Sequence, residues 1–259
     1  MNTGDTAFIL VSAALVMLMT PGLALFYGGM VRNKNVLGTI MQSFLVIGVI
    51  SVEWVLWGYS MAFGPDKWGI IGGLEWFGLS GVSLEPSSVY ATTIPHQLFM
   101  IYQCMFAVIT PALITGAFAE RMKFGPFLIF SILWATFIYN PLCHWIWGSG
   151  GWLARLGAID FAGGVAVHLS SGVAALAAAI MMGKRKGYGT EEMRPHNLPM
   201  TLLGAGLLWF GWFGFNAGSA LSAGSLAGTA FIATHLAAST GMLGWLAAEW
   251  KIRGKATTL

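Results

Sequence analysis

Seven long stretches of this chain carry almost no formal charge, and each is long enough to cross a lipid bilayer as a helix. Such a helix needs about 20 consecutive apolar residues. Only 9% of the residues are charged, whereas a soluble domain carries about a quarter. The sequence therefore predicts an all-α membrane protein, a polytopic helical bundle that forms a single transmembrane domain over residues 1–259. The predicted spans are Thr6–Met30, Val36–Phe63, His96–Phe118, Phe127–Trp147, Phe161–Met182, Leu198–Ala220 and Gly228–Trp250.

Prolines fall inside several predicted spans, and one long glycine-rich segment separates the second span from the third. Pro21, followed by Gly22, is expected to interrupt the first span, because proline removes a backbone donor. Pro141 is expected to bend or end the fourth span for the same reason. The repeated glycines of residues 64–95 predict a loop in place of a further span.

The basic residues fall almost entirely in the loops on one side of the predicted bundle. Eleven of the 13 lysines and arginines follow spans one, three, five and seven, and two lie in the other loops. Cytoplasmic loops are the basic ones, so the N-terminus is predicted outside and the C-terminus inside. We expect a multi-pass protein of the plasma or inner cell membrane, surrounded by lipid bilayer. This bias accounts for the net charge of +3, and no nucleic-acid partner is predicted.

His168 stands near the middle of the fifth span, where it is the single ionisable side chain. Gly164 and Gly172 lie one helical turn before and after it on the same face, which leaves space beside the imidazole. An ionisable group at membrane depth is costly, so a functional role is the first hypothesis. The alternative, a histidine hydrogen-bonded to a neighbouring helix, stays open from this stretch alone.

Aromatic rings and one hydroxyl gather in the outer half of the predicted bundle, near the depth of His168. Counting about 1.5 Å per residue from the outer face places Phe106 near that level, with Phe215, Ser219 and Trp147 further out. An aromatic face attracts a small cation by roughly 0.5–2 kcal/mol. Each residue also has a structural explanation as a core, lipid-facing or interfacial side chain. These positions alone predict a polar path through the bundle and no more.

The other ionisable residues in or beside the spans have structural interpretations. Asp160 precedes the fifth span and is predicted to cap it, because a carboxylate accepts the free backbone N–H groups of a helix start. Glu53, inside the second span, is predicted to be a hydrogen-bonded structural acid rather than a proton relay. His235 is expected to make a helix–helix hydrogen bond. His96 is expected to be solvated in an interfacial turn, and His144 to lie in a vestibule or an interfacial belt.

Six short motifs, spread in order along the whole chain, resemble signatures of the ammonium transporter (Amt/Mep/Rh) family, most closely its Amt branch. They are TPGLALFYGG at residues 20–29, GYSMAF at 58–63, GAFAER at 116–121, DFAGGxxxH at 160–168, PHNLP at 195–199 and GWFGFNAGSA at 211–220. The resemblance implies part of an eleven-span fold in which an inverted five-plus-five repeat surrounds each pore. It also implies transport of ammonium, ammonia or methylammonium, a homotrimer, and a PII-type signalling protein on the cytoplasmic face.

The motifs further imply roles for single residues in the outer half of the path. Trp147 and Ser219 resemble the outer cation-recruitment site, with Tyr102 as a neighbour one turn above Phe106. Phe106 and Phe215 resemble the stacked phenyl gate of the family. The gate is expected to exclude hydrated ions from the pore below it.

His168 resembles the first of two histidines that line the hydrophobic pore of the family. Asp160 resembles the essential aspartate of the family. Carrying a full charge through a dry pore costs several kcal/mol or more, so the implied mechanism removes a proton at or below the gate. Neutral ammonia then passes, bonded to imidazole nitrogen. The second histidine, on the tenth span of the family, has no counterpart here, because His235 does not match the motif.

Several alternatives accompany this interpretation. With seven predicted spans against eleven, the chain is expected to be a fragment of a longer protein, or else a truncated homologue with an incomplete pore wall that does not conduct. A membrane receptor that senses ammonium is the second functional class. An enzyme that uses His168 and Asp160 is the third and is disfavoured, because no nucleophile set or metal-ligand cluster converges with them. No cofactor and no metal site are predicted.

Overall fold

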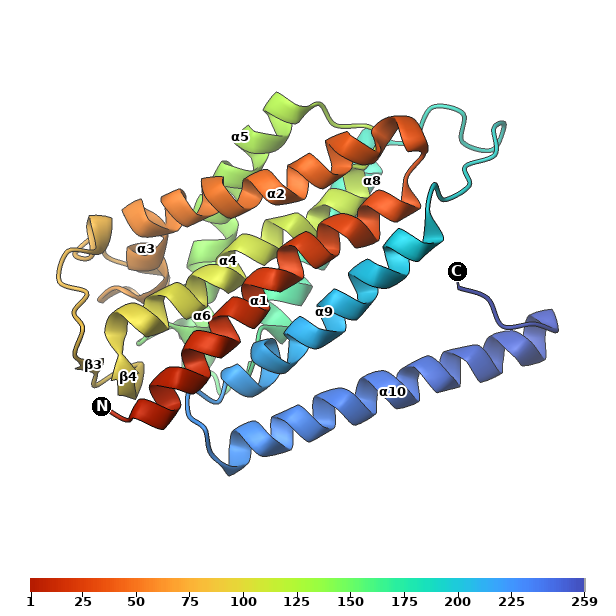
Figure 1. The fold of residues 1–259 in the computed structure, drawn as a ribbon. Helices are drawn as coiled ribbons and strands as arrows, with labels where there is room; N and C mark the ends of the chain where they lie inside the picture. Colours follow the sequence, from red (N-terminus) through yellow and green to blue (C-terminus); the bar gives the residue numbers. More distant parts are fainter. Residues whose placement is uncertain (259) are drawn as a thin grey trace.

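The computed structural model describes residues 1–258 as a bundle of long helices that run side by side (Figure 1). Within that part of the chain, seven helices are long and apolar enough to cross a membrane. The predicted all-α polytopic fold is therefore confirmed, and the helices begin and end within a few residues of the expected bounds.

The first three spans are joined by a short turn at one end of the bundle and a long loop at the other. The elements are α1 (Thr3–Met30), η1 (Asn33–Asn35), α2 (Val36–Glu53), η2 (Trp54–Gly58), α3 (Tyr59–Phe63) and α4 (His96–Phe118). The long loop contains no span, as predicted, but it forms two small antiparallel hairpins that the sequence did not indicate. These are β1 (Asp66–Lys67) with β2 (Ile71–Gly72), and β3 (Pro86–Ser87) with β4 (Ala91–Pro95), separated by η3 (Phe77–Leu79).

The last four spans include two that contain a wider, π-helical turn. The elements are α5 (Phe124–Trp134), η4 (Ala135–Tyr139), α6 (Asn140–Trp147), α7 (Trp152–Arg155), η5 (Gly164–Leu169), α8 (Ser170–Met182), α9 (Leu198–Gly218) and α10 (Ser225–Arg253). The π-helical turns are η4 in the fourth span and η5 in the fifth, and η2 forms a third in the second span. Turns of this kind are rare and are frequently found at functional sites.

Proline does not interrupt the first span, contrary to the expectation from the sequence. α1 is continuous with Pro21 inside it. It packs along α9, where the missing side chain of Gly22 lets its backbone come close to Leu207. Contact with a neighbouring helix makes a proline tolerable in a membrane helix. The fourth span likewise continues past Pro141, which sits in the first turn of α6 directly after the π-helical turn.

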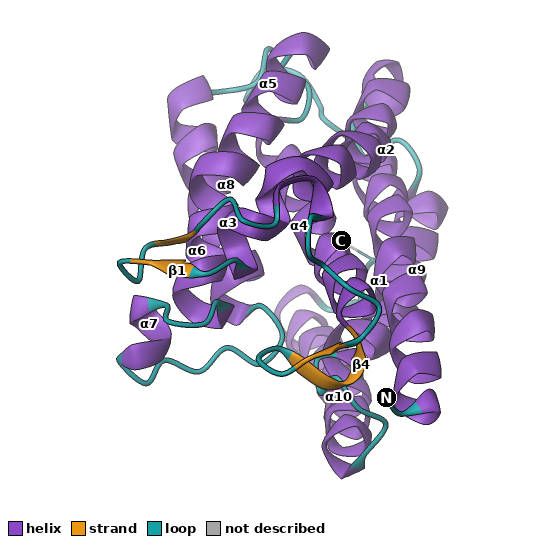
Figure 2. Cartoon of the chain, turned by 90° about the vertical axis from the view of Figure 1, so that its left-hand side faces the viewer, coloured by secondary structure: helices purple, strands orange, loops and turns teal. Residues whose placement is uncertain are grey.

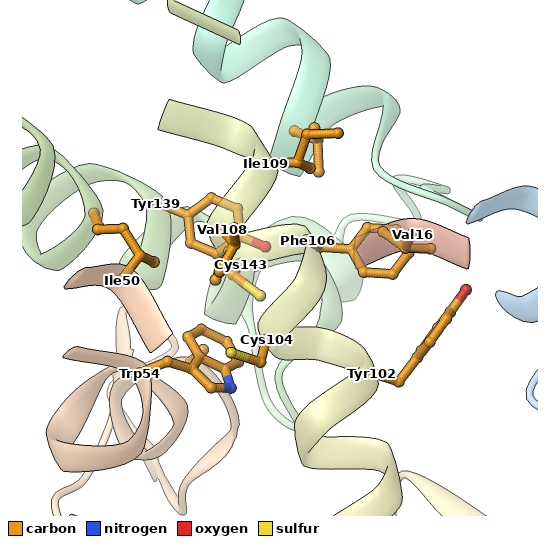
Figure 3. Close-up of a cluster of buried hydrophobic side chains, with 14 of the residues drawn as sticks. Val16, Ile50, Trp54, Tyr102, Cys104, Phe106, Val108, Ile109, Tyr139 and Cys143 are labelled. Carbon is orange, nitrogen blue, oxygen red and sulfur yellow. The ribbon is translucent and has the colours of Figure 1, made fainter. Parts of the chain in front are cut away.

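α4 runs through the centre of the bundle, and 17 of its 23 residues are buried. Tyr102 and Phe106 project from one side of this helix, whereas Cys104 projects from the other side, towards Trp54 (Figure 3). α10 differs, because it lies at the edge of the bundle beside α9 and leaves most of its surface uncovered (Figure 1). The centre of the fold is therefore the set of helices that contact α4.

The loops at one end of the bundle are hydrogen-bonded to each other and to the N-terminus (Figure 2). Asn2 N–H donates to the carbonyl of Thr93 over 2.6 Å. The N–H of Ser149 donates to the hydroxyl of Tyr90 over 2.9 Å, which joins the loop before α7 to the loop before α4. This is the end predicted to be outside. Its loops form a connected layer over the helix ends.

Two histidines beneath this layer are buried, so the expectations for both were wrong. His96 is 6% exposed, and its Nε2 lies 2.5 Å from the hydroxyl of Tyr59. His144 is fully buried, with Nδ1 2.9 Å from the carbonyl of Ala62 and Nε2 3.0 Å from Asp66 Oδ1. The hydrogen bond from His144 lowers the pKa of Asp66. The sequence placed both histidines near the ends of spans but could not show that the folded loop covers them.

At the opposite end, Glu120 is the centre of an ion cluster that joins three loops. Its carboxylate accepts hydrogen bonds from the backbone N–H of Arg32 at 2.8 Å and from its Nε at 3.0 Å. Arg185 lies 3.8 Å away. Burial raises the pKa of Glu120, but the hydrogen bonds from Arg32 and Asn35 and the charge of Arg32 together outweigh burial and hold the pKa below its usual range. The loops after the first, third and fifth spans are thus held together by charge.

Glu120→Gln is expected to make the protein less sensitive to acid. Because the pKa of Glu120 is lower in the folded state than its ordinary value of 4.5, its stabilisation is complete above that pH and is lost as pH falls through the folded pKa. At pH 7 we expect the melting temperature of the variant to be lower by about 2–4 °C. Thermal unfolding in detergent between pH 7 and pH 3 measures both effects. Glu85→Gln, on the exposed outer loop, is the control, and superimposable profiles for Glu120→Gln and the unmodified chain would contradict the prediction.

Candidate functional site

A cavity of about 260 Å³ opens at the outer end of the bundle between α4, α6 and the C-terminal end of α9. Four of the residues singled out by the motifs line it, namely Phe106, Trp147, Asp160 and Ser219. The sequence did not indicate four further lining residues, Phe63, Tyr90, Phe99 and Gln103. Of these, Phe99 and Gln103 share a face of α4 with Phe106, at helical spacing. Tyr90 comes from the long loop, whose path has no signal in the sequence.

Below the cavity, aromatic rings follow one another towards the interior. The ring centroids of Trp147 and Phe106 are 6.1 Å apart, with the planes at 84°. Phe106 and Phe215 follow at 4.5 Å, and both are 1% exposed. Phe215 in turn lies 5.7 Å from the imidazole of His168. The structure thus brings together in one column the four rings that the sequence placed on four different spans.

Tyr102 lies behind this column and holds the end of α9. It is fully buried, and its hydroxyl lies 2.9 Å from the carbonyl of Gly214 and 3.3 Å from Ser219 Oγ. A side chain at Gly218 would come within 2.6 Å of that hydroxyl, so only glycine admits the contact. Ser219 Oγ also donates to the carbonyl of Phe215 over 2.8 Å. Tyr102 therefore positions Ser219 and Phe215 as a neighbour of the residues that resemble the recruitment site.

Asp160 occupies the capping position that its place before the fifth span predicts. Oδ1 accepts the backbone N–H groups of Gly163 and Gly164 at 2.6 and 2.8 Å. Oδ2 accepts those of Val165 and Ala166 at 2.8 and 2.9 Å. Each oxygen receives two hydrogen bonds, so the whole carboxylate is used to fix the start of the π-helical turn that carries His168. The carbonyl of Asp160 also accepts a hydrogen bond of 2.8 Å from Trp147 Nε1.

The imidazole of His168 is half-buried and is held by rings. It stacks on Trp212 with the centroids 5.7 Å apart and the planes at 13°. Its side chain makes no hydrogen bond to any residue from 1 to 258, which leaves both ring nitrogens available. Gly172 is exposed, and a side chain there would meet no atom within 4 Å, so the helix surface one turn after His168 is open. Trp212 was not predicted to take part, although it lies within the motif at residues 211–220.

Comparison with known proteins identifies the family. The model of the "Ammonium Transporter Family" matches residues 7–259. The chain belongs to the ammonium transporter family. It is 59% identical to an ammonium transporter of Bacillus subtilis (strain 168) over 259 residues, which are 100% of this chain and 63% of that protein.

Solved structures of the ammonium transporter family have the same fold. The crystal structure of Candida albicans Mep2 superposes with a TM-score of 0.92 at 38% identity and covers 100% of this chain and 57% of Mep2. A structure named "Sensor Amt Protein" gives a TM-score of 0.91 at 30% identity, covering 98% of this chain and 64% of that one. The chain thus spans about three fifths of the length of these relatives. It is a multi-pass protein of the cell membrane.

Two further ionisable residues of this ammonium transporter family member lie away from the ring column. Glu53 is 2% exposed, and its Oε1 accepts hydrogen bonds from Thr136 Oγ1 at 3.0 Å and Asn140 Nδ2 at 2.8 Å, as the prediction of a hydrogen-bonded acid requires. His235 contacts the rings of Trp209 and Phe213 on α9. The hydrogen bond expected for His235 is not formed with any described residue, because its neighbours on α9 are aromatic.

Proposed function

We propose that this family member transports ammonium or methylammonium across the cell membrane and releases the substrate on the far side as ammonia plus a separate proton. The observation that carries the proposal is the unbroken column from the cavity through Trp147, Phe106 and Phe215 to His168, with centroid separations of 4.5–6.1 Å. The family supplies the substrate class, because relatives along the whole chain are named ammonium transporters.

Recruitment takes place in the cavity above Phe106. The faces of Trp147 and Phe106 attract a cation by roughly 0.5–2 kcal/mol, and Ser219 Oγ keeps a lone pair free while its proton is donated to Phe215. Asp160 contributes its negative charge to this end of the path, although its lone pairs are occupied by backbone N–H groups. The site therefore favours a small cation that has shed part of its water.

Passage requires that the charge be removed, because two buried phenyl rings close the bottom of the cavity. A full charge at this depth costs several kcal/mol, whereas neutral ammonia passes between apolar rings at lower cost. Below Phe215, the unbonded nitrogens of His168 accept a hydrogen bond from ammonia or donate one to it. The stacking on Trp212 fixes the plane of the imidazole while leaving its edge free.

Uptake of radiolabelled methylammonium into proteoliposomes tests the proposal. Phe215→Leu removes the ring that contacts both Phe106 and His168, so we expect uptake to fall at least about tenfold, equivalent to about 1.4 kcal/mol. Phe210→Leu is the matched control, since Phe210 is 56% exposed on the same helix, and it should leave uptake unchanged. Equal uptake by Phe215→Leu and the unmodified protein would refute the gate.

A sensor of ammonium is the second candidate function, favoured by the similarity to the "Sensor Amt Protein" over 98% of this chain. Protein that binds methylammonium but accumulates none in proteoliposomes would support the sensor and exclude transport. The proposal also includes a homotrimer and a PII-type partner on the cytoplasmic face, both of which the family resemblance implies. The distribution of basic loops predicts that the N-terminus lies outside the cell, and the cavity then opens to the same side.

A further inference from the structure

Gln103 lies in the wall of the cavity and carries an amide group that no part of the protein uses. The residue is 9% exposed, and its Oε1 is buried without a hydrogen-bond partner among residues 1–258. A buried amide without a partner is costly. Buried polar side chains in folded proteins are almost always paired, with protein or with bound molecules. Gln103 therefore carries an unpaired amide in the cavity wall, which can bond a ligand once its oxygen faces the cavity.

Apart from Ser219 Oγ, which keeps a lone pair free, the other polar side chains of the cavity wall are already occupied. The carboxylate of Asp160 accepts four backbone N–H groups, and Trp147 Nε1 donates to the carbonyl of Asp160. The hydroxyl of Tyr90 donates to the carbonyl of Phe63 over 2.7 Å and accepts from a backbone N–H. A cation that loses water on entering the cavity thus finds attractive ring faces but few oxygen atoms with which to bond.

The position of Gln103 places its amide where such a cation would stand. It precedes Phe106 by three residues on α4, so both side chains lie on the same face of the helix. No hydrogen bond from a described residue fixes the amide, and its terminal torsion is soft. Half a turn about that bond exchanges the oxygen with the nitrogen and presents the oxygen to the cavity.

We infer that Gln103 is a ligand of the recruited cation, and that its amide oxygen accepts an N–H of ammonium or methylammonium directly above the ring of Phe106. The inference rests on the proposed function. The rings supply attraction without a fixed direction, whereas an amide oxygen bonds a charged N–H donor along a defined line and more strongly than a neutral one. Gln103 would then select cations that carry N–H groups and orient the one N–H that points at the gate.

Equilibrium binding of radiolabelled methylammonium to the purified protein in detergent tests the inference without requiring transport. Gln103→Met keeps the length of the side chain but has no amide oxygen, and we expect its dissociation constant to rise about tenfold, because a hydrogen bond to a charged group is lost. Gln103→Glu keeps an oxygen at the same place and should bind at least as tightly as the unmodified protein. Gln97→Met is the matched control, since Gln97 is exposed on the same helix and bonds the carbonyl of Val82.

Each outcome of this experiment decides the question. Unchanged binding by Gln103→Met overturns the inference and leaves the proposed function intact. Equal loss in Gln103→Met and Gln103→Glu also overturns it, because the shape of the side chain would then matter and the oxygen would not. Failure of the unmodified protein to bind methylammonium would overturn recruitment at this cavity altogether. Selective loss in Gln103→Met without transport by the unmodified protein would uphold the ligand while refuting transport.

Discussion

Asp160→Ala is expected to abolish methylammonium uptake and to destabilise the protein by at least about 2 kcal/mol. The variant leaves four backbone N–H groups without their acceptor, at the start of the turn that carries His168. Gly163 and Ala166 are buried, so water has little access to their unpaired donors. We expect η5 to shift or fray, and the imidazole to lose its place below Phe215.

Two measurements separate capping from a direct role of the charge. Thermal unfolding in detergent reports the loss of the cap, and uptake into proteoliposomes reports transport. Asp160→Asn keeps one oxygen, which serves two of the four N–H groups, so its melting temperature should lie between those of Asp160→Ala and the unmodified protein. If Asp160→Asn loses uptake completely while keeping most of the stability, the charge itself is required. Full uptake by Asp160→Ala would contradict both roles.

The contrast between Asp160 and His144 shows what the sequence can and cannot predict about this site. The cap at Asp160 follows from local chemistry, because an acid directly before an apolar helix has few other uses. His144 lies near the end of a helix, but its hydrogen-bond partners are more than 70 positions away in the sequence. Such contacts have no local signal. Buried and exposed histidines at the end of a span therefore look the same in the sequence.

The same division applies to the cavity wall. The depth of Phe106 and of His168 follows from counting residues along a helix, and their facing positions across spans are consistent with the motifs. Tyr90 reaches the cavity only because the β3–β4 hairpin folds the long loop back beside α4, and strands this short carry no clear pattern. The role of Gln103 cannot be predicted from the sequence, because a glutamine without a hydrogen-bond partner looks the same there as one that is bonded to its neighbours. Its lack of a partner is visible only when the surrounding atoms are in place.

Glu53 and Asn140 form a second pair of contacts at which a single substitution should have a large effect on stability. Both side chains are buried, at 2% and 0% exposure, and they join the second span to the fourth. η2 begins directly after Glu53, and η4 ends directly before Asn140. The pair therefore connects two π-helical turns on neighbouring helices. Within residues 1–258, Glu53 Oε2 and Asn140 Oδ1 have no partner, so the pair already carries unmet hydrogen-bonding capacity.

Asn140→Leu is expected to lower the free energy of unfolding by about 2–4 kcal/mol, because the buried acid loses a hydrogen bond and gains no substitute. Glu53→Leu removes the costly acid itself, and Thr136 keeps the hydrogen bond that it accepts from Trp57. It should therefore be less damaging. With both partners replaced, neither the acid nor the amide remains unpaired between the spans, and the double variant should be more stable than Asn140→Leu alone by about 1 kcal/mol or more. Denaturant unfolding of the three variants in detergent measures this coupling, and additive effects would show that the two side chains act independently.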